Sequence, residues 1–233
     1  MGVVHCCAKG AILRSSDSAS QHIAEALSSS MTPGPRVGIL GSTTFHSKMG
    51  PPLCAALGKS LAEAGLVLVT GGNYRKNKPT VQQTVASAFH KAASDPPNVL
   101  YHLCPSDSKH MNQWRFGEVM VAGKTGAERG AVLARMCTAY ILVEGGNGAA
   151  LEGQAVLDIG NVLIPVACTG GAASGMFWRD PLRLRSMPDT TTWPAIDPDD
   201  WKLVTNFAAA PIEELTSAIV RLVLAVSCHV FSI

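Results

Sequence analysis

Short runs of apolar residues alternate with segments of helical spacing along most of the chain. Five of these runs have the length and composition of buried strands, and they span residues 36–40, 66–70, 99–104, 140–143 and 162–166. Helix-forming segments follow each run or lie between runs, over residues 51–64, 79–93, 125–136, 149–159 and 211–226. Strands that are apolar along their whole length and alternate with helices are typical of a parallel sheet covered on both faces. The pattern predicts one doubly wound, Rossmann-like α/β domain over residues 35–233.

The first 34 residues lack this pattern. They are rich in serine and alanine and end at Met31-Thr32-Pro33-Gly34-Pro35, where proline and glycine indicate a linker. We therefore expect a flexible N-terminal tail over residues 1–34, with a short helix at 20–27. Residues 180–200 are rich in proline and acidic side chains, and we interpret them as a surface loop.

Small residues, chiefly glycines, follow four of the five predicted strands. The pairs are Gly41-Ser42, Gly71-Gly72, Gly145-Gly146 and Gly170-Gly171. In an open parallel sheet the ligand crevice lies beyond the carboxyl ends of the strands, where glycine lets backbone amides approach a phosphate. Glycines that only turn the chain would explain any one pair, but four pairs in one sheet favour a nucleotide site. The fingerprint G-x-G-x-x-G is absent after the first strand, so an NAD dehydrogenase is disfavoured.

Residues 144–152 read Glu-Gly-Gly-Asn-Gly-Ala-Ala-Leu-Glu and join the fourth strand to a helix. The backbone amides of this loop are candidates to bind a phosphate, and they belong to Gly145, Gly146, Asn147, Gly148 and Ala149. Glu152 follows in the first helical turn, where a carboxylate also suits the helix dipole for purely structural reasons. Arg129 lies near the start of the preceding helix, where a cation opposes the dipole. This position indicates an anionic partner, either a ligand or a carboxylate, unless the side chain is simply exposed to solvent.

Composition excludes several classes of protein. Apolar residues make up 47% of the 233 residues and the formal net charge is +2, so the chain is neither disordered as a whole nor a nucleic-acid binder driven by bulk charge. The seven cysteines form no CxxC pair, which disfavours a disulfide scaffold and a zinc ribbon, and we expect no metal site. No apolar run reaches the ~18 residues of a membrane span, and no secretory signal precedes the domain. A cytoplasmic protein is the expectation.

The spacing of Arg129 and the glycine loop resembles that of the LOG proteins, which carry an arginine followed fifteen residues later by P-G-G-x-G-T-x-x-E. Here Arg129 precedes Glu144, the first residue of the loop, by fifteen residues. The resemblance covers residues 36–166. It implies a phosphoribohydrolase that cleaves the N-glycosidic bond of a nucleoside 5′-monophosphate without a cofactor. It also implies that Arg129 and Glu152 are the catalytic residues.

The chain departs from the LOG pattern at several positions. Glu144 stands in place of the proline and Ala149 in place of the threonine, which removes a hydroxyl donor to a phosphate. We expect the Glu144 carboxylate to meet ribose hydroxyls or a cation. The glycine-rich segment after the second strand is replaced by residues 73–78, whose three cations would either bind phosphate or form a solvated loop. The wider SLOG superfamily contains non-catalytic sensors of nucleotide derivatives such as ADP-ribose, and this is the alternative function. A lysine decarboxylase is disfavoured, because no lysine context for pyridoxal phosphate is present.

Two further expectations concern association. The LOG resemblance implies a homodimer, for which Val132, Leu133 and Met136 are candidate contacts, although core packing explains these residues equally well. Gly2 is a candidate for myristoylation and Cys6 and Cys7 for palmitoylation, and two acyl chains would anchor the protein at a membrane. The motif match is imperfect because Cys6 stands where serine or threonine is usual.

Overall fold

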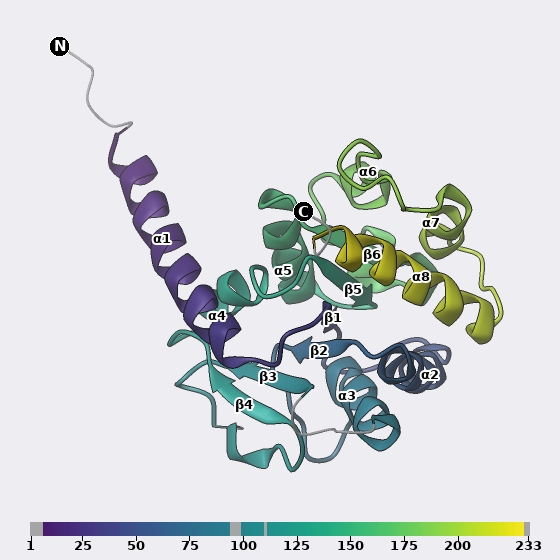
Figure 1. Cartoon of the computed structure of the whole chain (residues 1–233), viewed down its shortest axis with the longest axis horizontal. Helices are drawn as coiled ribbons and strands as arrows, with labels where there is room; N and C mark the ends of the chain where they lie inside the picture. The colour runs from purple at the N-terminus through teal and green to yellow at the C-terminus, as the bar shows by residue number, and fades with distance from the viewer. Residues whose placement is uncertain (1–6, 94–98, 110, 231–233) are drawn as a thin grey trace.

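A six-stranded parallel sheet forms the centre of the computed structural model, which describes residues 7–93, 99–109 and 111–230 (Figure 1). The strands are β1 (Arg36–Gly41), β2 (Val67–Thr70), β3 (Leu100–Cys104), β4 (Glu118–Val121), β5 (Ala139–Val143) and β6 (Val162–Val166). Their order in the sheet is β4-β3-β2-β1-β5-β6, and all neighbours are parallel. The chain therefore builds outward from β1 in one direction and then crosses back to β5 on its other side. The predicted doubly wound, Rossmann-like α/β fold is confirmed.

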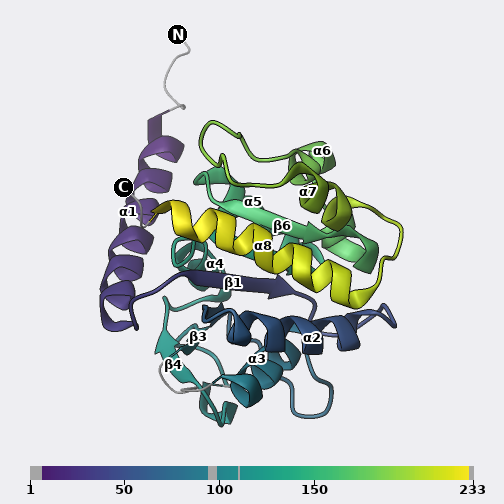
Figure 2. The same ribbon diagram turned by 45° about the vertical axis from the view of Figure 1, so that its right-hand side comes forward.

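Helices cover both faces of the sheet (Figures 1 and 2). One face packs against α2 (Gly50–Glu63), α3 (Val81–Ala92), α7 (Pro198–Thr205) and α8 (Ile212–Val230). The other packs against α4 (Gly126–Leu133), α5 (Asn147–Asp158), α6 (Pro181–Arg185) and the last turns of α1 (Cys7–Ser30). Side chains of β1 alternate between the two layers, with Val37 and Ile39 in the first and Leu40 in the second. Burial of both faces explains why the strands are apolar throughout.

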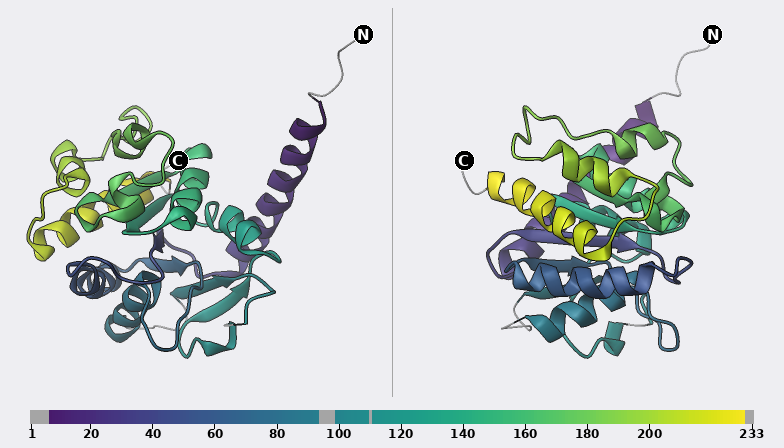
Figure 3. Two further views of the ribbon diagram at one scale, coloured as in Figure 1. Left: turned by 180° about the vertical axis from the view of Figure 1, so that it is seen from behind. Right: turned by 90° about the vertical axis from the view of Figure 1, so that its right-hand side faces the viewer.

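The N-terminal segment contains more helix than the sequence predicted. The short helix expected at residues 20–27 is part of α1, whose first half extends beyond the domain (Figure 3). Its last turn is tied to the domain, since Nη2 of Arg36 donates to the Ser28 carbonyl oxygen at 3.0 Å. The backbone amide of Thr32 also donates to the Tyr101 hydroxyl at 2.8 Å. Gly2 and Cys6 lie outside the described residues, and the side chain of Cys7 is also outside them.

One expectation about the fold was wrong, and one strand was missed. Residues 180–200 contain α6 and the start of α7 rather than only a loop, and β4 was not predicted.

The candidate dimer contacts Val132, Leu133 and Met136 are at most 3% exposed, because they pack in the core that α4 shares with the sheet and α1. Core packing within one chain therefore accounts for them. No helix among the described residues is long and apolar enough to cross a membrane.

Candidate functional site

A cavity of about 790 Å³ lies beyond the carboxyl ends of β1, β5 and β6. Its walls include Gly41 and Ser42 after β1 and Thr169 after β6. Four residues of the loop after β5 also line it: Glu144, Gly145, Gly146 and Gly148. Strands β1 and β5 are neighbours, but the chain leaves them toward opposite sides of the sheet. Such a topological switch point opens a crevice between the diverging loops, and it is the usual ligand site of this fold class.

Arg129 and Glu152 lie in contact on the wall of this cavity. Nη1 of Arg129 is 2.8 Å from Oε1 of Glu152, and the two side chains are only 8% and 15% exposed. Arg129 comes from the first turn of α4 and Glu152 from the second turn of α5, not the first turn as expected, because α5 begins at Asn147. The carboxylate is the anionic partner that the position of Arg129 indicated.

The ion pair leaves donors of Arg129 unused. Its Nε has no hydrogen-bond partner among the described residues, and Nη1 meets Glu152 without the alignment of a hydrogen bond. Buried donors without partners are rare in folded proteins, and those found in a cavity often meet a ligand. The Arg129 guanidinium can therefore hold an anionic or hydroxylated ligand group while it remains beside Glu152.

The N-terminus of α5 faces the same cavity. Gly146 caps this helix and offers no side-chain acceptor to the first backbone amides. These amides lack carbonyl partners inside the helix, and together with the helix dipole they favour a bound anion. Gly145 makes the approach possible, since its φ of +102° is left-handed and a β-carbon there would lie 2.6 Å from Cβ of Ala149. The phosphate-binding role predicted for this loop has a suitable backbone geometry.

Glu144 has neither of the partners that the sequence suggested. It is 1% exposed, and its carboxylate accepts hydrogen bonds from the backbone amides of His46 and Ser47 at 3.0 and 2.9 Å. Its own amide donates to Oγ1 of Thr169 at 2.9 Å. The residue also has a φ of +52°, an unusual conformation for a side chain larger than glycine. Glu144 therefore joins the loops after β1, β5 and β6, and its negative charge is directed to backbone donors.

Most of the predicted site residues line the cavity, but three do not. Gly41, Ser42, Gly145, Gly146, Gly148, Ala149, Arg129 and Glu152 line it. Gly71 instead makes room for Arg129, since a β-carbon there would lie 2.3 Å from Nη1. Gly72 packs against Cys104, and Asn147 is exposed outside the lining.

The cations of residues 73–78 do not line the cavity either. Arg75, Lys76 and Lys78 are exposed, which favours the solvated-loop alternative, and only Asn73 of this segment reaches the cavity wall. Sequence reasoning missed the loop after β1, where Thr43, Thr44 and His46 line the cavity. Met176 and Phe177 were missed as well, although two large apolar residues in a glycine-rich loop were a usable signal.

The described residues contain no group of three or more histidine, cysteine, aspartate or glutamate side chains placed to hold a metal ion. His102 is buried away from the cavity lining and bonds to Oγ1 of Thr70 at 2.8 Å and to the Phe116 carbonyl oxygen at 3.0 Å. Burial lowers the pKa of His102 to about 3. Cys137 is a core residue, and burial raises the pKa of its thiol to about 12.

Residues 35–174 match the family model described as the SLOG cluster4 family, which is more than half of the chain. The chain belongs to the SLOG cluster4 family. The matched segment of this SLOG cluster4 protein contains β1 to β6, Arg129, the glycine loop and Glu152. Phe177, α1, α6, α7 and α8 lie outside the matched segment.

Several solved structures share the fold of this SLOG cluster4 protein at low sequence identity. The protein TM1055 is 20% identical with a TM-score of 0.49, and the match covers 65% of this chain and 89% of that one. The molybdenum cofactor carrier protein of Chlamydomonas reinhardtii is 19% identical with a TM-score of 0.45, covering 62% and 82%. The molybdenum cofactor binding protein of Rippkaea orientalis is 19% identical with a TM-score of 0.46, covering 65% and 93%. No curated protein sequence is significantly similar to the chain.

Proposed function

We propose that this protein is a phosphoribohydrolase that cleaves the N-glycosidic bond of a nucleoside 5′-monophosphate, releasing the base and ribose 5-phosphate. The observation that carries the proposal is the Arg129–Glu152 pair on the wall of the cavity at the switch point. Glu152 lies in the second turn of α5, so the ion pair is separate from the N-terminus of this helix, which supplies an anion site of its own. One cavity thus offers a place for the phosphate and a carboxylate for the sugar.

The chemistry assigns a role to each group. Cleavage of the N-glycosidic bond builds positive charge on the ribose ring, and a carboxylate beside the anomeric carbon stabilises that charge and helps to deliver water. Glu152 takes this role. Arg129 positions Glu152 and directs its unused donors to the ribose or the phosphate. The backbone amides at the start of α5 bind the phosphate.

A non-catalytic receptor for a nucleotide derivative such as ADP-ribose is the second candidate. Ala149 favours it, because this residue lacks the hydroxyl that the LOG motif places beside the phosphate. Glu144 favours it too, since a buried carboxylate in the phosphate loop makes the local field less suited to a dianionic phosphate. Both candidates predict nucleotide binding, and only the first predicts turnover.

A panel of nucleoside 5′-monophosphates distinguishes the two candidates. Each compound is incubated with the purified protein, base release is followed by chromatography, and binding is measured in parallel by calorimetry. Release of base from at least one nucleotide, with ribose 5-phosphate in equal amount, supports the phosphoribohydrolase. Tight binding of a nucleotide or of ADP-ribose without any release supports the receptor.

Two finer features also remain proposals. We propose that the protein forms a homodimer, as the LOG resemblance implies, with a contact surface other than Val132, Leu133 and Met136. Light scattering at micromolar concentration that gives the monomer mass of 24.4 kDa would argue against it. We also propose that a cytoplasmic pool reaches membranes through acylated Gly2, Cys6 and Cys7. A Gly2→Ala variant that fractionates with membranes as the wild type does would refute that proposal.

A further inference from the structure

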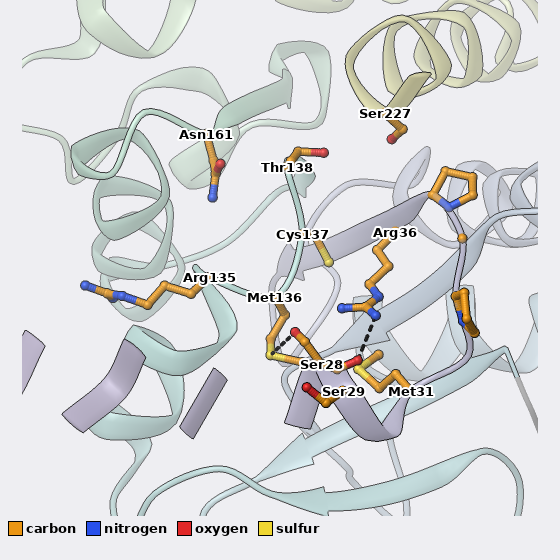
Figure 4. A pocket seen from close by; sticks show the side chains of 13 residues that line it. Ser28, Ser29, Met31, Arg36, Arg135, Met136, Cys137, Thr138, Asn161 and Ser227 are labelled. Atoms are coloured by element: carbon orange, nitrogen blue, oxygen red, sulfur yellow. Dashed lines mark hydrogen bonds between the residues drawn. The ribbon is translucent and has the colours of Figure 1, made fainter. Parts of the chain in front are cut away.

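A second cavity, of about 520 Å³, lies at the amino ends of the strands, opposite the candidate site at their carboxyl ends. Arg36 opens β1, Thr138 precedes β5 and Asn161 precedes β6, so the cavity lies where parallel strands begin. The end of α1, the linker after it and Ser227 of α8 complete its walls (Figure 4). Because the switch-point cavity lies where the same strands end, the two cavities are separate sites.

The charged side chains described in the lining of this cavity are all basic. Among the described residues that line it are Arg36 and Arg135, and none is an aspartate or a glutamate. Cys137 also lines the cavity but supplies no counter-charge, because burial raises the pKa of its thiol to about 12. The guanidinium of Arg135 extends away from Arg36 and donates to the Ala131 carbonyl oxygen at 2.8 Å (Figure 4). Arg36 is therefore the cation that lacks a negatively charged partner among the described residues of this cavity.

Two buried donors in this cavity have no partner among the described residues. Nη2 of Arg36 donates to the Ser28 carbonyl oxygen at 3.0 Å, but its Nε has no acceptor. Ser227 is 1% exposed, and its hydroxyl also has none. Folding removes these groups from bulk water without replacing the lost hydrogen bonds, which costs stability unless another acceptor enters. Among the described residues that line the cavity, a cation without an acidic partner and a hydroxyl without an acceptor both suit an anionic oxygen.

We propose that this cavity binds a small organic anion, a molecule with a phosphate or carboxylate group and an apolar portion. The anionic group pairs with the Arg36 guanidinium, and the Ser227 hydroxyl donates to a second oxygen of the ligand. The apolar portion packs against Met31 and Met136, which line the same cavity. Since Ser28 and Met31 belong to the end of α1 and the linker, the bound anion fastens the N-terminal segment to the domain.

Methionine methyl signals report the two cavities separately. Met31 and Met136 line this cavity, whereas Met176 lines the switch-point cavity. Protein labelled with ¹³C-methyl methionine is titrated with phenyl phosphate, with benzoate and with the neutral benzyl alcohol. We expect saturable shifts at Met31 and Met136 with at least one anion, and binding of benzyl alcohol at least tenfold weaker. Saturable shifts confined to Met176, equal affinity for the neutral compound, or no shift with any probe would overturn the proposal.

Two variants test the named donors. Arg36→Gln should weaken anion binding at Met31 and Met136 at least tenfold and leave the Met176 response unchanged, while Arg36→Lys retains most of the affinity. Arg36 also holds Ser28, so Ser227→Ala serves if the first variant fails to fold. Loss of one hydrogen bond predicts a decrease in affinity of about fivefold for Ser227→Ala. Wild-type affinity in both Arg36→Gln and Ser227→Ala, or in Ser227→Ala alone when the other is unfolded, would overturn the proposal.

Discussion

Replacing Glu144 with glutamine tests the role of the buried carboxylate that joins the three loops of the site. The side chain keeps its size, and the left-handed backbone at this position costs the same in both proteins because the β-carbon is unchanged. Only the acceptors change. The carboxylate accepts hydrogen bonds from the backbone amides of His46 and Ser47. A glutamine offers only one acceptor oxygen and turns an NH₂ group toward the second amide.

The expected loss of stability follows from these two bonds. A hydrogen bond to a charged acceptor contributes ~1.5–3 kcal/mol, and a neutral one ~0.5–1.5 kcal/mol. Glu144→Gln weakens one bond and abolishes the other, but the exposed His46 can meet water. We therefore expect a loss of about 2–4 kcal/mol in the free energy of unfolding. In a chain of this size that corresponds to a decrease in Tm of roughly 4–16 °C.

Urea unfolding followed by circular dichroism measures the change, with Glu63→Gln as the matched control. Glu63 makes an exposed ion pair with Lys59 at 3.6 Å, so the control should lose less than about 1 kcal/mol. If Glu144→Gln is as stable as the control, the carboxylate does not hold these loops together and the reasoning is refuted.

Two other predictions concern single residues. Gly71→Ala places a β-carbon 2.3 Å from Nη1 of Arg129. This variant should lower nucleotide affinity in calorimetry, or turnover in base-release assays, at least about tenfold. Gly126→Ala is the control: its β-carbon meets nothing within 4 Å, so both affinity and turnover should be unchanged. Equal behaviour of the two variants would show that Arg129 does not need that space. Burial lowers the pKa of His102 to about 3, so the unfolded chain, with a histidine pKa of ~6.5, binds a proton that the folded protein excludes. Stability should be retained above about pH 6.5 and fall below it by up to ~1.4 kcal/mol per pH unit, and a His102→Gln variant with the same slope in urea unfolding would contradict this assignment.

The sequence predicted the central strands well because burial on both faces leaves a clear apolar signal. β4 lacked that signal, since it is an edge strand in which only Met120 is buried. α7 was not predicted because the residues that start it also indicate a loop. Asp197 caps this helix and Pro198 is its first residue, and aspartate and proline are both common in loops. Trp201 and Val204 anchor this helix in the core, a tertiary contact that local composition does not reveal.

The structure brings together those predicted site residues that local sequence marks, whereas contacts between distant segments were not predicted. Arg129, Glu152 and the glycine loop follow from residue type, spacing and position at strand and helix ends. Glu144 was assigned the wrong partners because its acceptors are satisfied by amides 97 and 98 residues earlier in the chain. Gly71 was assigned to phosphate binding because local sequence cannot show that the neighbour of a glycine is the Arg129 side chain.

The central claim is that Glu152 acts on the glycosidic bond, and the most direct test compares base release by the wild type and by Glu152→Gln on the best substrate of the nucleotide panel. Asp158→Asn is the control, because Asp158 is an exposed carboxylate at the end of the same helix. We expect the wild type and the control to turn over equally. Glu152→Gln should bind the nucleotide nearly as well and release base on the order of a hundredfold or more slowly, since the lost interaction belongs to the transition state. Base release by Glu152→Gln at the wild-type rate, or a wild type that binds nucleotides and releases no base, would contradict the claim.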